Sequence, residues 1–192
     1  MFKPKLNSDE ILKAEYDYIA ATVFQANEDR ARGASFYYVS VGSIVAAILG
    51  AQLTEDNLHS VALPFFILFL VMTVLGALTL AQLARLRAAW HESVEAMNMV
   101  KEYYLKQNPE IESAFKWRTH TIPETNKPNS IADLTAKQVT LLGALMAGAA
   151  VYFLLLWLEW VNLPGFIAMA AAALLGRMGL WAYYKHLLVD DR

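Results

Sequence analysis

The chain lacks cysteine and has few charged residues, and both shortages restrict what it can be. Without a cysteine among its 192 residues, it has no disulfide framework, no thiolate metal site and no cysteine nucleophile. Charged residues make up 18% of the sequence and hydrophobic residues 57%, a balance that is typical of membrane proteins and unusual for a soluble domain. The composition therefore indicates the membrane class.

Motifs of catalysis and cofactor binding are also missing. The sequence has no phosphate-binding loop, no dinucleotide-binding glycine pattern and no serine in a nucleophile elbow. The four histidines are scattered over different segments, and the single pair on a shared helical face, His91 and Glu95, is weak evidence for a metal site. We expect no enzyme activity, no catalytic residue, no cofactor, no metal and no nucleic-acid partner.

Four apolar segments are long enough to cross a lipid bilayer. Ala34–Leu53 and Val61–Leu83 carry no charged side chain, and each is long enough as a helix for a hydrocarbon core of about 30 Å. Two more segments, 139–160 and 163–180, follow a loop that contains prolines. The predicted fold is all-α, an integral membrane protein whose four transmembrane helices form two hairpins.

Both helices of the first hairpin are expected to continue beyond the membrane. Apolar residues recur in alternating steps of three and four before Ala34 and after Leu83, which is the pattern of an amphipathic helix. Ser8 is the expected N-cap of the first helix, and Pro109 ends the second. We expect these extensions to pack as an antiparallel pair. The seam residues that would carry contacts are Leu12, Tyr16, Ile19, Val23, Trp90, Met97, Val100 and Tyr104.

The sequence divides into five predicted parts. They are a cytoplasmic amphipathic helix at 1–33, the first transmembrane hairpin at 34–86, a cytoplasmic helix and proline-containing loop at 87–138, the second hairpin at 139–184, and a cytoplasmic tail at 185–192. The helix that begins in 34–86 is expected to run from Val61 to Lys106. Within the loop, the sequence predicts a short helix at 110–117 and a capping box formed by Ser130 and Asp133.

Lysine and arginine predict the orientation. All sixteen lie before the first span, between the second and third spans, or from Arg177 onward, and the hairpin turns contain none. By the positive-inside rule, both termini and the 84–138 segment are cytoplasmic, and we expect a multi-pass protein of the cytoplasmic (inner) membrane. Arg177 is expected to snorkel from the fourth span toward the cytoplasmic headgroups. The aromatic residues expected at the inner interface are Tyr37, Tyr38, Trp181, Tyr183 and Tyr184, and those at the outer interface are Trp157 and Trp160.

Small residues recur at every fourth position in three of the spans. Such spacing lets helices approach closely in a membrane. Packing within the chain is the first interpretation, and association between copies is the second. The residues are Gly42, Ala46 and Gly50 in the first span, Ala144 and Gly148 in the third, and Ala172 and Gly176 in the fourth.

The layout of Ser8–Lys106, a cytoplasmic helix that enters a membrane hairpin and a long helix that returns, resembles the SLATT membrane effectors of bacterial conflict systems. That resemblance implies a protein that oligomerises and perturbs the membrane when a partner enzyme signals. The second hairpin, after residue 138, departs from the SLATT layout. The segment Glu15–Leu53, with Tyr18-Ile19-Ala20 and Phe24–Arg30, is also similar to uncharacterised small four-span bacterial membrane proteins.

Three functions fit the sequence. The first is a non-enzymatic accessory or scaffold subunit that associates with a protein partner, or with its own copies, through its cytoplasmic helices and its small-residue transmembrane faces. The second is a self-assembling membrane effector or pore of the SLATT kind. The third is a small transporter or channel, which would need polar residues such as Ser43 or Thr73 near the middle of the membrane.

Overall fold

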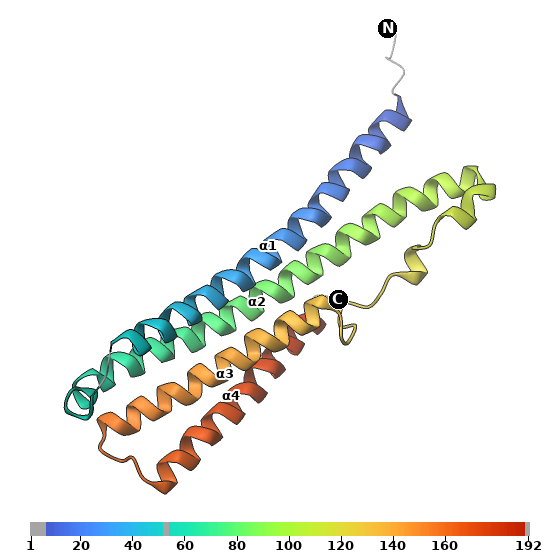
Figure 1. Cartoon of the computed structure of the whole chain (residues 1–192). Helices are drawn as coiled ribbons and strands as arrows, with labels where there is room; N and C mark the ends of the chain where they lie inside the picture. The colour runs from blue at the N-terminus through green and yellow to red at the C-terminus, as the bar shows by residue number, and fades with distance from the viewer. Residues whose placement is uncertain (1–6, 52–53, 191–192) are drawn as a thin grey trace.

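The computed structural model describes residues 7–51 and 54–190, and these segments contain helices and no strand. All four α-helices are long and apolar enough to cross a membrane, in agreement with the all-α prediction. They are α1 (Ser8–Gly50), α2 (Glu55–Gln107), α3 (Ile131–Trp157) and α4 (Leu163–Asp190), with two short 3₁₀ helices, η1 (Pro109–Ala114) and η2 (Thr119–Thr121), between α2 and α3 (Figure 1).

Helix α1 is one continuous helix of 43 residues, which makes it about 65 Å long at the standard rise. Its N-cap is Asn7, so the prediction of Ser8 is wrong by one residue. The helix passes through Gly33 without interruption. A Cβ at Gly33 would lie 2.9 Å from Oε1 of Gln82, so the glycine leaves room for the end of the Gln82 side chain of α2.

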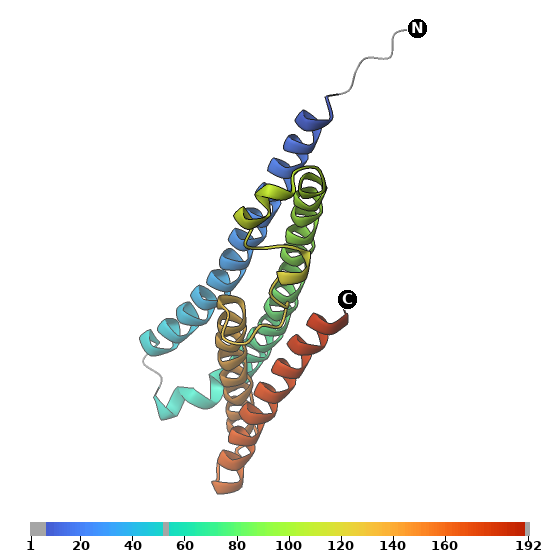
Figure 2. The same ribbon diagram turned by 90° about the vertical axis from the view of Figure 1, so that its right-hand side faces the viewer.

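Helix α2 begins at Glu55 and not at Val61, so the turn between α1 and α2 is shorter than predicted. The backbone N–H of Thr54 donates to Oδ1 of Asn57 at 2.9 Å, and this bond starts a helix within a polar stretch that resembles a loop. Pro64 lies inside the helix. Figure 2 shows the first turns of α2 bent away from the rest, as expected where a proline removes a backbone donor.

The segment between α2 and α3 differs from the prediction at both ends. The expected helix at 110–117 is replaced by η1 and a short irregular stretch. At the start of α3, the Ser130 hydroxyl accepts from the Asp133 N–H at 3.3 Å, and the Asp133 carboxylate accepts from the Asn129 N–H at 2.9 Å. Ser130 is therefore the N-cap as predicted, but the Asp133 carboxylate accepts from Asn129 and not from Ser130 as a capping box requires.

Helix α4 extends to Asp190 and not only to residue 180. Its start is fixed by Asn162, whose side-chain oxygen accepts from the Gly165 N–H at 3.0 Å. Its last turns are retained because Tyr184 and Leu188 are buried in the hydrophobic core, and their burial stabilises a segment that is too polar to resemble a span.

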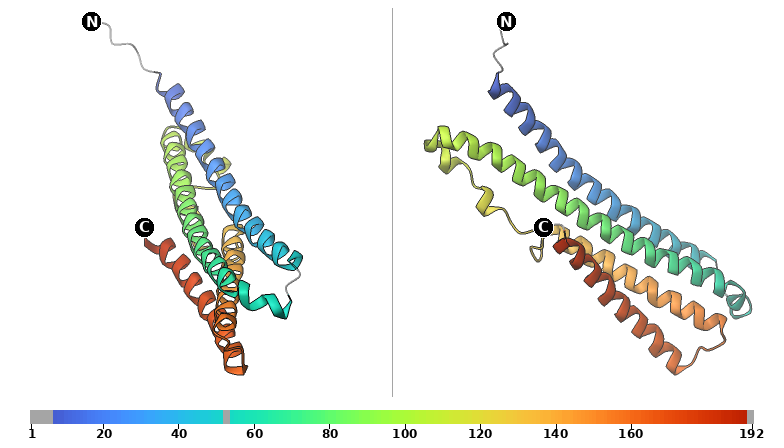
Figure 3. Two further views of the ribbon diagram at one scale, coloured as in Figure 1. Left: turned by 90° about the vertical axis from the view of Figure 1, so that its left-hand side faces the viewer. Right: turned by 180° about the vertical axis from the view of Figure 1, so that it is seen from behind.

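Helix α2 lies at the centre of the bundle and contacts each of the other three α-helices. Within the described residues α1 and α4 do not contact each other, and they lie on different sides of α2 and α3 (Figures 1 and 3). The core includes a stack in which the ring of Phe153 lies 5.0 Å from that of Phe65 and 5.4 Å from that of Phe69. At one end, α1 and α2 extend well beyond α3 and α4 (Figure 1).

Candidate interaction surfaces

The extended ends of α1 and α2 enclose a groove, which we call the distal groove. Figures 1 and 3 show α1 diverging from α2 toward its N-terminus, and the space between them has a volume of about 630 Å³. Its apolar lining comes from both helices and from the η1 region, and charged side chains of both signs (Asp9, Lys13 and Lys101) lie at its edges. The apolar lining residues are Leu12, Tyr16, Val100, Tyr104, Ile111 and Phe115.

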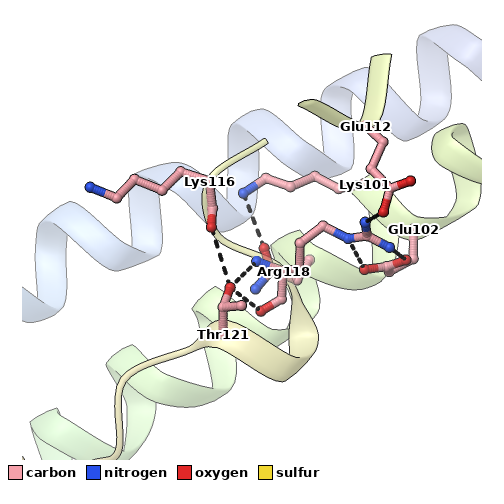
Figure 4. Close-up of polar contacts among 7 residues, drawn as sticks. Lys101, Glu102, Glu112, Lys116, Arg118 and Thr121 are labelled. Atoms are coloured by element: carbon pink, nitrogen blue, oxygen red, sulfur yellow. Dashed lines mark hydrogen bonds and ion pairs between the residues drawn. The ribbon is translucent and has the colours of Figure 1, made fainter. Parts of the chain in front are cut away.

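Arg118 holds the η1 region against α2. Its Nε and Nη2 atoms donate to the two carboxylate oxygens of Glu102, each at 2.7 Å, and its Nη1 donates to Glu112 of η1 (Figure 4). The hydrogen bonds from Arg118 lower the pKa of the Glu102 carboxyl. A bidentate guanidinium–carboxylate pair is stronger than a single-point contact and fixes orientation. We call the Arg118–Glu102–Glu112 cluster the arginine clamp.

Replacing Arg118 by methionine is expected to release residues 109–121 from α2 and to open one side of the distal groove. Because the clamp is the main polar connection of this segment and lies partly in solvent, amide hydrogen exchange in 109–121 should rise about three- to tenfold. The matched control is Arg32→Met, because Arg32 is exposed and pairs within its own helix. Unchanged exchange in 109–121 of the Arg118 variant would contradict the clamp.

A buried amide and a lysine lie next to the distal groove. The side chain of Asn98 is 0% exposed; its Oδ1 accepts from Nζ of Lys101 at 3.0 Å, while its Nδ2 has no hydrogen-bond partner. The Lys101 ammonium also lies 6.0 Å from the centre of the Phe115 ring. Burial lowers the pKa of Lys101. The lysine therefore connects α2 to the segment that closes the groove.

The structure places the predicted seam residues in two groups. Leu12, Tyr16, Val100 and Tyr104 line the distal groove. Nearer the bundle the two helices touch, and the Thr22 hydroxyl donates to that of Ser93 at 3.2 Å. There Ile19 is 8% exposed. It is therefore not available to a partner, although the sequence predicts that it contacts one. Val23, Trp90 and Met97 are half-buried, and the guanidinium of Arg87 lies 4.4 Å from the Trp90 ring centre.

The predicted small-residue positions separate into inward and outward sets. A Cβ at Gly148 would lie 3.1 Å from Cβ of Ala173, and one at Gly176 would lie 3.2 Å from Cβ of Ala147 and 3.7 Å from Cα of Ala144. These small residues bring α3 and α4 together, while Ala172 is half-buried on α4. The small residues of α1 do not pack within the chain, because Cβ atoms at Gly42 and Gly50 would meet nothing within 4 Å and Ala46 is exposed. We call Gly42, Ala46 and Gly50 the outer stripe.

Two of the aromatic residues expected at the inner interface are buried among the helices of the bundle. Tyr37 is 1% exposed, and its hydroxyl donates to the Met72 carbonyl at 3.3 Å. It fits there because Gly76 has no side chain to fill the same space. Tyr184 is also buried. Tyr183, Trp157 and Trp160 are exposed, while Tyr38 and Trp181 are half-buried.

Two partly buried arginines, Arg30 on α1 and Arg87 on α2, are close enough to influence one another electrostatically. Burial lowers the pKa of Arg30, and burial together with the nearby positive charge of Arg30 lowers the pKa of Arg87. Arg30 donates to the Asn27 side chain at 2.9 Å. Arg87 donates to the backbone carbonyls of Thr125 at 3.1 Å and Glu124 at 3.3 Å. Arg87 therefore attaches the loop before α3 to the side of α2.

The remaining candidates lie apart from one another. Arg177 is exposed near the middle of α4, whereas Glu159 precedes α4 and its carboxylate lies 3.7 Å from the His59 ring. Thr73 donates to a carbonyl of its own helix, and Ser43 is exposed on α1.

Over residues 7–51 and 54–190, no group of three or more histidine, aspartate or glutamate side chains is arranged to hold a metal ion.

Comparison of the chain with protein-family models, with curated proteins and with solved structures finds no match.

Proposed function

We propose that this chain is a non-enzymatic, multi-pass membrane protein that serves as an accessory or scaffold subunit and binds an apolar helix of a protein partner in its distal groove. In this proposal α1–α4 cross the membrane as two hairpins, and both termini and the distal groove are cytoplasmic. The distal groove is the observation that carries the proposal. The charge distribution of the sequence supports the orientation.

Helix length supports a position for the groove outside the bilayer. Helices α3 and α4 have 27 and 28 residues, or about 40 Å, which suits one crossing with interfacial turns. Helices α1 and α2 have 43 and 53 residues, and the excess lies at the end that carries the groove (Figure 1). An apolar groove in water is an interaction surface more often than an accident of packing.

The chemistry of the groove favours a protein over other partners. Tyrosine, phenylalanine and aliphatic side chains line it and charges of both signs surround it, which is the usual anatomy of a protein interface. A nucleic acid or an anionic surface would need charge of one sign. Large side chains are also exposed on the same extension, namely Tyr18, Phe24, Met99 and Tyr103. An amphipathic helix with anchors at helical spacing fits such a groove.

The test is the composition of the native particle, extracted into nanodiscs and weighed by native mass spectrometry. We expect a second, stoichiometric protein that Tyr16→Glu removes, with a fall of about tenfold or more in the amount bound, because an unpaired charge is placed in an apolar interface. Tyr18→Glu is the matched control, since Tyr18 is exposed on the same helix and does not line the groove. Equal loss with both variants, or no second protein, would contradict the proposal.

The outer stripe supports a second candidate, a self-assembling effector or pore similar to the SLATT proteins. Gly42, Ala46 and Gly50 face away from the bundle, and small residues in that position let two copies of α1 approach closely in a membrane. The same measurement separates the candidates. A particle of several identical chains that Gly42→Leu disperses and Tyr16→Glu does not would favour self-assembly and would overturn the scaffold proposal.

A further inference from the structure

The outward face of α3 and α4 carries a second groove, separate from the distal groove, which we call the lipid groove. It has a volume of about 690 Å³ and lies between the N-terminal half of α3 and the C-terminal half of α4. Figure 3 shows these two helices side by side from behind. One part of its lining is aliphatic, from Leu134, Leu141, Leu174 and Met178. The other part is polar, from Lys137, Gln138, Thr140 and Arg177, with Trp181 beside it.

The polar part of the lipid groove carries an excess of positive charge. Lys137 pairs with Asp133 at 2.8 Å, so these two charges largely offset one another. Burial raises the pKa of Asp133, but hydrogen bonds from Lys137 and the Asn129 N–H outweigh it and keep the pKa low. Arg177 has no carboxylate partner among the described residues. Lys185 lies beside the groove, 5.0 Å from the centre of the Trp181 ring, and also attracts the Asp133 carboxylate. Arg177 is therefore the lining cation that is left without a carboxylate.

Thr140 supplies a second and independent indication of a ligand. Its side chain lines the lipid groove and is only 3% exposed, yet its hydroxyl has no hydrogen-bond partner. Other helical threonines of this chain satisfy their hydroxyls within the helix: Thr73, Thr79 and Thr135 donate to the carbonyl four residues earlier at 2.9, 2.9 and 2.8 Å. A buried hydroxyl left without a partner is costly, and a bound acceptor would remove that cost.

We infer that the lipid groove binds one anionic phospholipid, with the phosphate at Arg177 and Thr140 and an acyl chain along Leu141 and Leu174. The inference rests on the membrane insertion proposed above. A phospholipid fits better than a free phosphate ion because the three leucines and the methionine of the lining are exposed on the outside of the bundle, where acyl chains would lie. Basic pockets between transmembrane helices on the cytoplasmic side are suited to lipid headgroups. Tryptophan is enriched at the level of the headgroups, and Trp181 would occupy that level in the proposed orientation.

The test counts bound lipid on the full chain by native mass spectrometry, from nanodiscs with equal phosphatidylglycerol and phosphatidylcholine. We expect about one retained phosphatidylglycerol per chain, and a drop in its affinity of about fivefold for Arg177→Gln and about fivefold for Thr140→Val. Arg85→Gln is the matched control, because Arg85 is an exposed arginine on α2 that does not line the groove. It should leave retention unchanged.

Thr140→Val also separates binding from folding. Its hydroxyl has no partner to lose, so thermal stability in phosphatidylcholine alone should not fall, whereas the added stability from phosphatidylglycerol should decrease. Equal retention of both lipids, an equal effect of Arg85→Gln, or full protection by inorganic phosphate would each overturn the inference. Release of the chain from membranes by alkaline carbonate would instead overturn the proposed membrane insertion, and that result is visible before any lipid is counted.

Discussion

Replacing Gly76 by leucine is expected to destabilise the protein strongly, because three helices meet at this glycine. A Cβ at Gly76 would lie 2.8 Å from the hydroxyl and 3.1 Å from Cζ of Tyr37 on α1, and 3.5 Å from Cα of Gly143 on α3. Tyr37 cannot move away easily, since it is buried and its hydroxyl donates to the Met72 carbonyl. Overpacking of this kind costs about 1–3 kcal/mol.

The measurement is thermal unfolding in a single detergent, followed by tryptophan fluorescence. For a chain of this size, the expected loss corresponds to a decrease in apparent Tm of about 3–10 °C. The matched control is Gly42→Leu, the same substitution in the outer stripe, where a Cβ would meet nothing within 4 Å. We expect its apparent Tm to stay close to that of the unchanged protein. Similar losses at both positions would mean that α1 does not pack as described.

Helix content and approximate helix length could be predicted from the sequence because they depend on local patterns. Apolar residues at steps of three and four run through Gly33 and beyond Leu83, and both helices continue there. The ends were less predictable. The start of α2 depends on reciprocal hydrogen bonds between Thr54 and Asn57. The end of α4 depends on the burial of Tyr184, which the local sequence does not indicate.

Which face of each helix is covered could not be predicted, because periodicity does not identify the neighbour. Gly42 and Gly148 occur in similar patterns of small residues, but Gly148 approaches Ala173 and Gly42 approaches nothing. Tyr37 was expected at the interface from the general preference of aromatic residues. It enters the bundle because a glycine on a different helix, Gly76, leaves space for it, and no single-helix pattern connects the two positions.

The distal groove was predictable on two of its sides. Leu12, Tyr16, Val100 and Tyr104 were identified as contact residues from their spacing, and all four line it. Its third side comes from Ile111 and Phe115, which the arginine clamp keeps near α2. The clamp joins Glu102 to Arg118 across a loop, and such a pair has no periodic signal. The third side of the distal groove could therefore not be predicted from the sequence.

The second large effect is expected at Arg87, where lysine should be nearly as damaging as methionine. The Arg87 side chain is 7% exposed and donates from two nitrogens to the carbonyls of Thr125 and Glu124. Methionine keeps the apolar stem but removes both donors. Lysine keeps the charge but lacks the planar fork that reaches two acceptors at once. Each variant should cost about 2 kcal/mol, because hydrogen bonds from a charged, buried group are lost.

Arg30→Met is the control for charge at Arg87, because the positive charge of Arg30 lowers the pKa of Arg87 and its removal relieves a repulsion. We expect Arg30→Met to leave the apparent Tm unchanged or to raise it. The two Arg87 variants should lower the apparent Tm by a few degrees and accelerate amide exchange about tenfold in residues 122–130. If Arg87→Lys behaves like the unchanged protein, the charge and not the forked geometry holds the loop. In that case a positive charge at position 87 would be sufficient for slow amide exchange in 122–130, and the two hydrogen bonds from the guanidinium to the carbonyls would not be required.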